Sequence, residues 1–211
     1  MEKKKYLSLA FYLLTAFVIW TIAVSFVDVK EIGPNGSAVG LSGINGFVHE
    51  FTGVNMDLYV ITDWLGLVPI SIASGFGVLG FVQFVKRKSI IKVDKNIIVL
   101  GLFYVAVLAA FVFFENFIVN YRPVLIDGTL EASYPSSTTM LTVFVMTTAL
   151  LQFDERIKND FIKKIVKVLI VVFIAFMVLG RTFSGVHWIS DIIGGVLLSF
   201  GLVCLYYYFT K

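Results

Sequence analysis

Three strongly polar side chains, Arg181, His187 and Asp191, stand close together between two long apolar runs of the chain. Charged and titratable groups at membrane depth are costly, and they usually mark a functional site. If a helix begins near His187, the spacing of four residues places Asp191 on the same face. A carboxylate there can accept a hydrogen bond from one imidazole nitrogen and leave the other free as a base or nucleophile. The alternative is a structural His–Asp pair at a helix start.

The apolar runs around these residues indicate an integral membrane protein. Of the 211 residues, 58% are hydrophobic and 15% are charged, whereas soluble domains average about 25% charged residues. The mean hydropathy is +0.91. We predict an all-α membrane protein, a single domain over residues 1–211 whose six transmembrane helices each cross about 30 Å of hydrocarbon. The expected spans are about 6–27, 60–85, 97–115, 136–153, 165–183 and 188–209.

The basic residues predict how this bundle is oriented. Fourteen of the seventeen Lys and Arg residues fall at the two termini or in the loops after the second and fourth predicted spans. By the positive-inside rule this side is cytoplasmic, so both termini are expected to be cytoplasmic. The net charge of +3 therefore reflects topology, and no nucleic-acid partner is expected. Lys30, Arg122 and Arg181 remain on the outer side.

Two further polar clusters fall at the same outer boundary. Residues 115–123, at the end of the third predicted span, contain Arg122, and residues 134–139, at the start of the fourth, read Tyr-Pro-Ser-Ser-Thr-Thr. In a six-helix bundle these loops can converge with residues 180–191. Each cluster alone has an ordinary explanation as an interfacial anchor or a helix cap. Their common position, on the side that otherwise lacks positive charge, indicates an anion site.

Phosphate is the anion that these groups suit. A guanidinium is planar, always charged, and matches phosphate oxygens in a bidentate fork. Pro135 suits the first turn of a helix. The backbone N–H groups of Ser136, Ser137 and Thr138 would then be free donors at the positive end of the helix dipole.

The three clusters resemble the motifs of the type-2 phosphatidic acid phosphatase superfamily of membrane lipid phosphatases. The family pattern is Lys, six residues and Arg-Pro; then Pro-Ser-Gly-His; then Ser-Arg, five residues, His, three residues and Asp. The third motif is the specific one, and the first two are matched in part. The matching residues, in the family's order and spacing, are Arg122-Pro123, Pro135-Ser136, Arg181, His187 and Asp191.

The resemblance implies a role for each matching position. His187 would attack phosphorus and form a phosphohistidine, and Asp191 would orient and polarise it. The family needs no metal, and the sequence holds no carboxylate-rich cluster that would bind one, so neither a metal nor a cofactor is expected. With nearby backbone amides, the residues that would hold the phosphate oxygens are Arg122, Arg181, Ser136 and Ser137.

The chain also departs from the family pattern. Glu115 stands where the family has a phosphate-binding Lys; two nearby arginines would keep it ionised, so we expect it to pair with an Arg or bind a polar part of the headgroup. Thr138 stands where the family has the His that protonates the leaving group. Thr138 can donate a hydrogen bond but cannot transfer a proton, a loss that typically costs about 10²–10⁴ in rate. Ser137 replaces Gly and Gly180 replaces Ser.

These features predict a metal-independent phosphatase of phosphorylated membrane lipids, in the cell membrane, with an extracytoplasmic active site. The substrate would be a polyprenyl diphosphate or a phospholipid. Because a phosphate leaving group needs protonation less than an alkoxide does, the missing acid favours a lipid diphosphate over a monophosphate. Two alternatives are a phosphotransferase on the same scaffold and a catalytically inactive lipid-phosphate-binding protein. A channel or transporter is disfavoured, because the polar groups lie at the outer boundary and not in mid-membrane.

Overall fold

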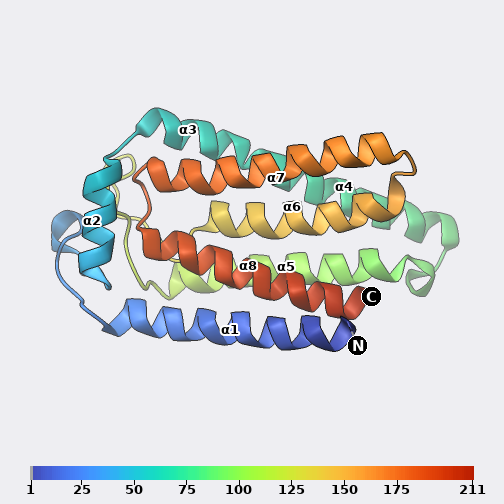
Figure 1. The fold of residues 1–211 in the computed structure, drawn as a ribbon, viewed down its shortest axis with the longest axis horizontal. Helices are drawn as coiled ribbons and strands as arrows, with labels where there is room; N and C mark the ends of the chain where they lie inside the picture. The colour runs from blue at the N-terminus through green and yellow to red at the C-terminus, as the bar shows by residue number, and fades with distance from the viewer. Residues whose placement is uncertain (1) are drawn as a thin grey trace.

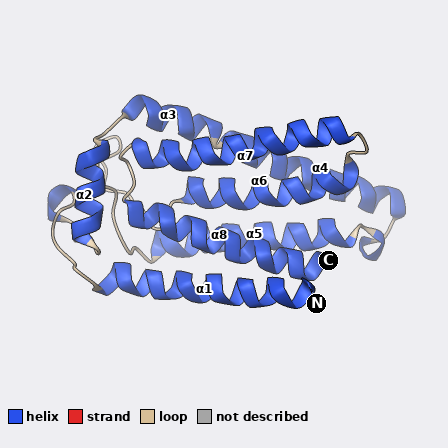
Figure 2. Ribbon diagram, viewed as in Figure 1, coloured by secondary structure: helices blue, strands red, loops and turns tan. Residues whose placement is uncertain are grey.

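The computed structural model describes residues 2–211, which form α-helices and two short 3-10 turns but no β-strand (Figure 2). The long helices run side by side, and one short helix, α2, lies across one end of them (Figure 1). The predicted all-α class is therefore confirmed. The elements are α1 (Glu2–Phe26), η1 (Pro34–Gly36), α2 (Ser42–Thr52), α3 (Met56–Leu65), α4 (Leu67–Arg87), η2 (Ile90–Lys92), α5 (Lys95–Asn116), α6 (Ser137–Arg156), α7 (Asp160–Phe183) and α8 (Ile189–Thr210).

Four helical stretches among the described residues are long and apolar enough to cross a membrane. They are α1, α3 with α4, α5 and α8, so the chain is a multi-pass membrane protein. Helices α6 and α7 lie beside them and have 20 and 24 residues, enough at 1.5 Å per residue to reach about 30 Å. We propose that α6 and α7 complete the six spans that the sequence predicts.

The second predicted span, 60–85, consists of two helices and starts earlier than expected. The side chain of Asn55 caps α3 by accepting a hydrogen bond from the Leu58 N–H at 2.9 Å, which satisfies one of the unpaired donors of a helix start. The helix breaks at Gly66, and α4 continues to Arg87. The first helix of this pair, α3, packs against α7.

Helix α6 is the centre of the bundle. It contacts α4, α5, α7 and α8, and ten of its twenty residues are buried. Because protein and not lipid surrounds it, α6 can carry hydroxyl side chains; Thr148, for example, donates to the Phe144 carbonyl at 2.9 Å. Apolar side chains of α1, α6 and α8, such as Phe17, Met140 and Leu198, pack into one core. The first residues of α6 are therefore held at the middle of one end of the molecule.

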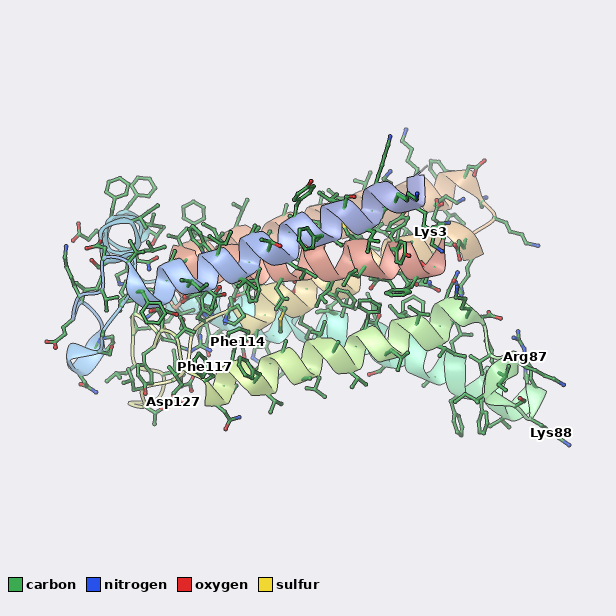
Figure 3. The ribbon with its side chains drawn as sticks, turned by 90° about the horizontal axis from the view of Figure 1, so that it is seen from below. Lys3, Arg87, Lys88, Phe114, Phe117 and Asp127 are labelled. Carbon is green, nitrogen blue, oxygen red and sulfur yellow. The ribbon has the colours of Figure 1, made fainter. Side chains whose placement is uncertain are left out.

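The two ends of the bundle differ in charge. Lys3, Arg87 and Lys88 lie at the end that also holds both termini, and Asp127 lies at the opposite end (Figures 1 and 3). The loops between α5 and α6 and between α7 and α8 are at the Asp127 end. The predicted orientation rests on the excess of basic residues at the end that holds the termini, where all but Lys30, Arg122 and Arg181 are expected.

The segment between α1 and α3 is fastened onto the bundle by hydrogen bonds and close packing. The buried Asn45 of α2 donates to the Ser190 hydroxyl at 3.0 Å and accepts from the Ser190 N–H at 3.1 Å. A side chain at Gly40 would meet the Val24 carbonyl oxygen at 1.6 Å, so only glycine permits this approach to α1. The segment thereby braces the start of α8.

The orientation predicts which ends of the chain a membrane-impermeant thiol reagent can reach. In a Cys204→Ala background, which removes the one native thiol, Asp127→Cys is expected to react in intact cells. Lys88→Cys is expected to react only after permeabilisation. Labelling of Lys88→Cys in intact cells, with Asp127→Cys protected, would reverse the proposed orientation.

Candidate active site

The imidazole of His187 is held between two arginines. His187 lies in the short turn between α7 and α8 and is 5% exposed. Its Nε2 atom is 3.1 Å from Arg122 Nη1 and 3.1 Å from Arg181 Nη2. Because a guanidinium can only donate hydrogen bonds, Nε2 is the acceptor and the ring proton resides on Nδ1.

The other ring nitrogen is tied to Asp191 through a serine. The Nδ1 atom of His187 is 2.9 Å from the Ser133 hydroxyl, which in turn donates to Asp191 Oδ2 at 2.5 Å. The carboxylate itself is 3.9 Å from Nδ1, too far for a hydrogen bond. The direct His187–Asp191 hydrogen bond that the spacing suggests is therefore replaced by a relay in which Ser133 accepts from one and donates to the other.

The carboxylate of Asp191 also holds the surrounding backbone together. It is fully buried, and its Oδ2 atom caps α8 by accepting from the Trp188 N–H at 3.0 Å. The Oδ1 atom accepts from Asn120 Nδ2 at 3.3 Å and from the Ser190 hydroxyl at 3.2 Å. The structural explanation of the His–Asp pair and the functional one thus both apply to the same side chain.

Arg122 is positioned by a hairpin-like loop between α5 and α6. The Arg122 N–H donates to the Glu131 carbonyl at 3.0 Å, and the loop reverses at Asp127-Gly128, where both residues have positive φ, as an Asp-Gly turn requires. The Nε atom of Arg122 is 3.0 Å from the carboxylate of Glu131. Arg122 thus pairs with Glu131, and Glu115 lines a narrow cavity with Arg122 and His187.

Arg181 is buried against α3. Its side chain is 1% exposed, its guanidinium carbon lies 4.9 Å from the centre of the Tyr59 ring, and its Nη1 atom is 3.4 Å from the Thr62 hydroxyl. The same nitrogen is 3.7 Å from the carboxylate of Asp63. Within residues 2–211 the Nε atom of Arg181 and the hydroxyl of Ser136 are both buried without a hydrogen-bond partner, so both can serve an anion.

The start of α6 supplies further donors. Ser136 precedes the helix, and the first helical hydrogen bond runs from the Met140 N–H to the Ser136 carbonyl at 2.9 Å. The N–H groups of Ser137, Thr138 and Thr139 therefore have no acceptor within the helix. The N–H of Ser136, which the sequence predicts to be free, instead donates to the Asp191 carbonyl at 3.0 Å.

An apolar groove of about 480 Å³ is lined by residues from the end of α3 and from α4, α5 and α6. Ser137 lines both this groove and the narrow cavity that contains His187. Thr138 faces the groove, and so does the carboxylate-bearing Asp63. Apolar side chains cover the rest of its wall, including Leu67, Ile70, Val107, Leu108 and Leu141.

The surroundings of His187 keep it neutral. Burial lowers the pKa of its imidazole well below the usual value, and the positive charges of Arg122 and Arg181 lower this pKa further. A neutral ring agrees with the hydrogen bonds, in which Nε2 accepts from both guanidiniums. The lone pair on Nε2 is therefore available at neutral pH, as a nucleophile requires.

The structure thus brings together most of the residues that the sequence predicts. Arg122, Arg181, His187 and Asp191 form one cluster, and Ser136 and Ser137 adjoin it, whereas Thr138 faces the groove and Glu115 the rim. Sequence reasoning missed Asn120, Ser133 and Asp63. A single Ser, Asn or Asp in an outer loop or at a helix end is common, so no pattern distinguishes these three positions.

Comparisons with known proteins agree with this geometry. A family model described as the PAP2 superfamily matches residues 97–211. The crystal structure of the first transmembrane PAP2 type phosphatidylglycerolphosphate phosphatase from Bacillus subtilis is similar in fold, with a TM-score of 0.59. The alignment covers 94% of each chain at 18% sequence identity. The search of curated proteins finds no match.

The lowered pKa of His187 predicts an acid-sensitive stability. In the unfolded chain the pKa of His187 is about 6.5. Below that pH the unfolded chain binds a proton at His187 that the folded chain does not bind, so the free energy of unfolding falls as pH falls. The slope contributed by one such group approaches about 1.4 kcal/mol per pH unit. Between pH 7.5 and 5, the Tm in detergent is expected to fall more for the wild type than for His187→Gln. Parallel curves for the two proteins would contradict a neutral, proton-rejecting His187.

Proposed function

The chain belongs to the PAP2 superfamily, and we propose that it is a membrane phosphatase that removes phosphate from a phosphorylated lipid. The observation that carries this proposal is the neutral, buried His187, whose Nε2 atom faces two guanidiniums at 3.1 Å each. A nucleophile surrounded by fixed positive charge suits a phosphoryl group and little else. We place the enzyme in the cell membrane with its active site on the extracytoplasmic side.

In the proposed mechanism His187 Nε2 attacks phosphorus and forms a phosphohistidine, which water then hydrolyses. Arg122 and Arg181 hold the equatorial oxygens, whose charge is spread in the transition state. The Ser136 hydroxyl and the N–H of Ser137 supply further donors. The proton on Nδ1 stays on the ring throughout, donated as a hydrogen bond to the Ser133 hydroxyl. The Asp191 carboxylate, which accepts from Ser133, stabilises the positive charge that the ring gains when Nε2 bonds to phosphorus.

We propose that the substrate's lipid tail lies in the apolar groove beside Thr138. Ser137 lines both the groove and the cavity that contains His187, and the rest of the groove wall is largely apolar, which suits a hydrocarbon chain. Since Thr138 cannot donate a proton to an alkoxide, a lipid diphosphate, such as a polyprenyl diphosphate, fits the site better than a monophosphate. Glu115, exposed at the rim of the narrow cavity, would contact a polar part of the headgroup.

The first test is phosphate release by the purified protein in detergent without added metal. Polyprenyl diphosphate, phosphatidate and phosphatidylglycerophosphate are each supplied to the wild type and to His187→Ala. We expect release that disappears in His187→Ala because the nucleophile is lost, with polyprenyl diphosphate cleaved fastest. The matched control is His49→Gln, which changes the other of the two histidines and is expected to retain activity.

Each outcome of this test has a distinct meaning. Release that is equal in the wild type and His187→Ala would refute the proposed nucleophile. Faster cleavage of phosphatidate than of polyprenyl diphosphate would refute the leaving-group argument. A new phosphorylated product with little free phosphate would favour the phosphotransferase on the same scaffold.

Filling the groove is expected to affect lipid substrates selectively. Ile70→Trp places a large side chain in the groove, so KM for a long-chain lipid phosphate is expected to rise about tenfold or more, while hydrolysis of the soluble p-nitrophenyl phosphate is retained. Val78→Trp is the matched control, since Val78 is exposed on the same helix. Equal effects of both variants on the lipid substrate would place the tail elsewhere.

A further inference from the structure

The proposed reaction needs a base that the described active-site cluster does not contain. Water must lose a proton when it attacks the phosphohistidine, and a positioned base typically speeds such a step by about 10²–10⁴. His187 carries the phosphoryl group at that stage, and Asp191 is enclosed behind Ser133. Thr138 has no basic atom at neutral pH. The base must therefore come from another side chain at the rim of the site.

The leaving group determines the side on which this base must lie. In an in-line displacement the nucleophile and the leaving group are on opposite sides of phosphorus. The lipid departs along the groove that Ser137 and Thr138 line, and water attacks the phosphohistidine from the side that the lipid has vacated. A base for this water must therefore face the groove.

Three carboxylates lie near the two arginines, and one of them meets this condition. Glu131 is engaged with Arg122 at 3.0 Å. Glu115 lines the narrow cavity that also contains Arg122 and His187, but it does not line the groove. Asp63 lines the groove together with Ser137 and Thr138. Its side chain is 59% exposed and its carboxylate is 3.7 Å from Arg181 Nη1, close enough to be neutralised as a pair but beyond the reach of a hydrogen bond.

Arg181 connects Asp63 to the nucleophile. One terminal nitrogen of the guanidinium is 3.1 Å from His187 Nε2, and the other is 3.7 Å from Asp63 Oδ1. The carboxylate and the nucleophile thus flank the same planar fork, which would hold the phosphoryl group between them. The positive charge of Arg181 also offsets the repulsion that an isolated Asp63 carboxylate would exert on a phosphate.

Two features of the sequence allow α3 to bring Asp63 to this place. At Gly180 an added Cβ would meet Thr62 Cγ2 at 2.7 Å, so a residue without a side chain lets α3 lie close against α7. At the junction of α3 and α4, a Cβ on Gly66 would be 3.7 Å from Thr138 Cγ2, which shows how near this junction is to Thr138. Gly180 and Thr138 are both positions at which the chain departs from the family motifs.

We propose that Asp63 is the catalytic base of the second step, an inference that rests on the proposed phosphatase function. In the first step Nε2 forms the N–P bond, and the bridging P–O bond breaks with its electron pair leaving on the lipid phosphate. In the second, the water oxygen forms a P–O bond while the Asp63 carboxylate takes a water proton. The N–P bond breaks, its electron pair returns to Nε2, and inorganic phosphate leaves; Asp63 then releases its proton to solvent.

Rapid-quench kinetics of Asp63→Asn with a radiolabelled polyprenyl diphosphate tests this assignment. The first turnover, seen as a burst of polyprenyl monophosphate, is expected to remain, whereas steady-state turnover falls roughly 10²- to 10⁴-fold and phosphoryl-enzyme accumulates. Adding Thr138→His, which supplies an imidazole at the same groove, is expected to restore turnover. Asp57→Asn is the matched control, because Asp57 is on the same helix in its first turn.

The outcomes separate this inference from the proposed function. If Asp63→Asn turns over as fast as Asp57→Asn, Asp63 is not the base. If Asp63→Asn loses the burst and the turnover equally, Asp63 acts by positioning Arg181, and the base assignment is overturned. If the wild type itself shows no release that depends on His187, the proposed function fails before Asp63 is tested.

Discussion

The buried carboxylate of Asp191 is the constraint on which the active-site end of this protein depends. A carboxylate without exposure is costly unless its lone pairs are filled, and here they accept from Asn120, Ser133, Trp188 and Ser190. These donors come from the α5–α6 loop and from the start of α8. One buried charge therefore fixes the loop that carries Arg122 relative to the helix that follows His187.

The same carboxylate sets the tautomer of His187, the proposed nucleophile. Through the Ser133 hydroxyl it holds the ring proton on Nδ1, and the two arginines face the lone pair on Nε2. Burial lowers the pKa of His187, and the positive charges of the two arginines lower it further. Each arginine has a carboxylate neighbour, Glu131 beside Arg122 or Asp63 beside Arg181, that offsets part of this positive charge.

Helix packing in the bundle positions the other parts of the site, which are the first turn of α6, the groove and the start of α8. Helix α6 is buried on most sides and can present its polar first turn at the end of the bundle that holds His187, while α4 and α5 leave an apolar groove beside it. The outer segment braces the start of α8 through Asn45 and Ser190. Rigid helices thus hold the proposed phosphate-binding groups, and the groove lies beside them along α4, α5 and α6.

The sequence predicted the all-α membrane class, the family and the convergence of Arg122, Arg181, His187 and Asp191, because apolar length and motif spacing are local properties. It could not reveal Ser133 or Asp63, whose importance arises only from contacts across 58 and 118 residues of chain, to Asp191 and Arg181 respectively. The sequence analysis also placed the start of the second span at residue 60, four residues after the start of α3 at Met56. An apolar run does not reveal a helix start that is set by the polar cap Asn55.

The most direct test of the central claim is to locate the phosphoryl group on the enzyme. Brief reaction with a radiolabelled polyprenyl diphosphate, followed by alkaline quench and peptide mapping, would isolate the phosphorylated residue. The account predicts phosphorylation of His187 at Nε2, because Ser133 and Asp191 keep Nδ1 protonated. A label on Nδ1, on another residue, or no label during active phosphate release would contradict it.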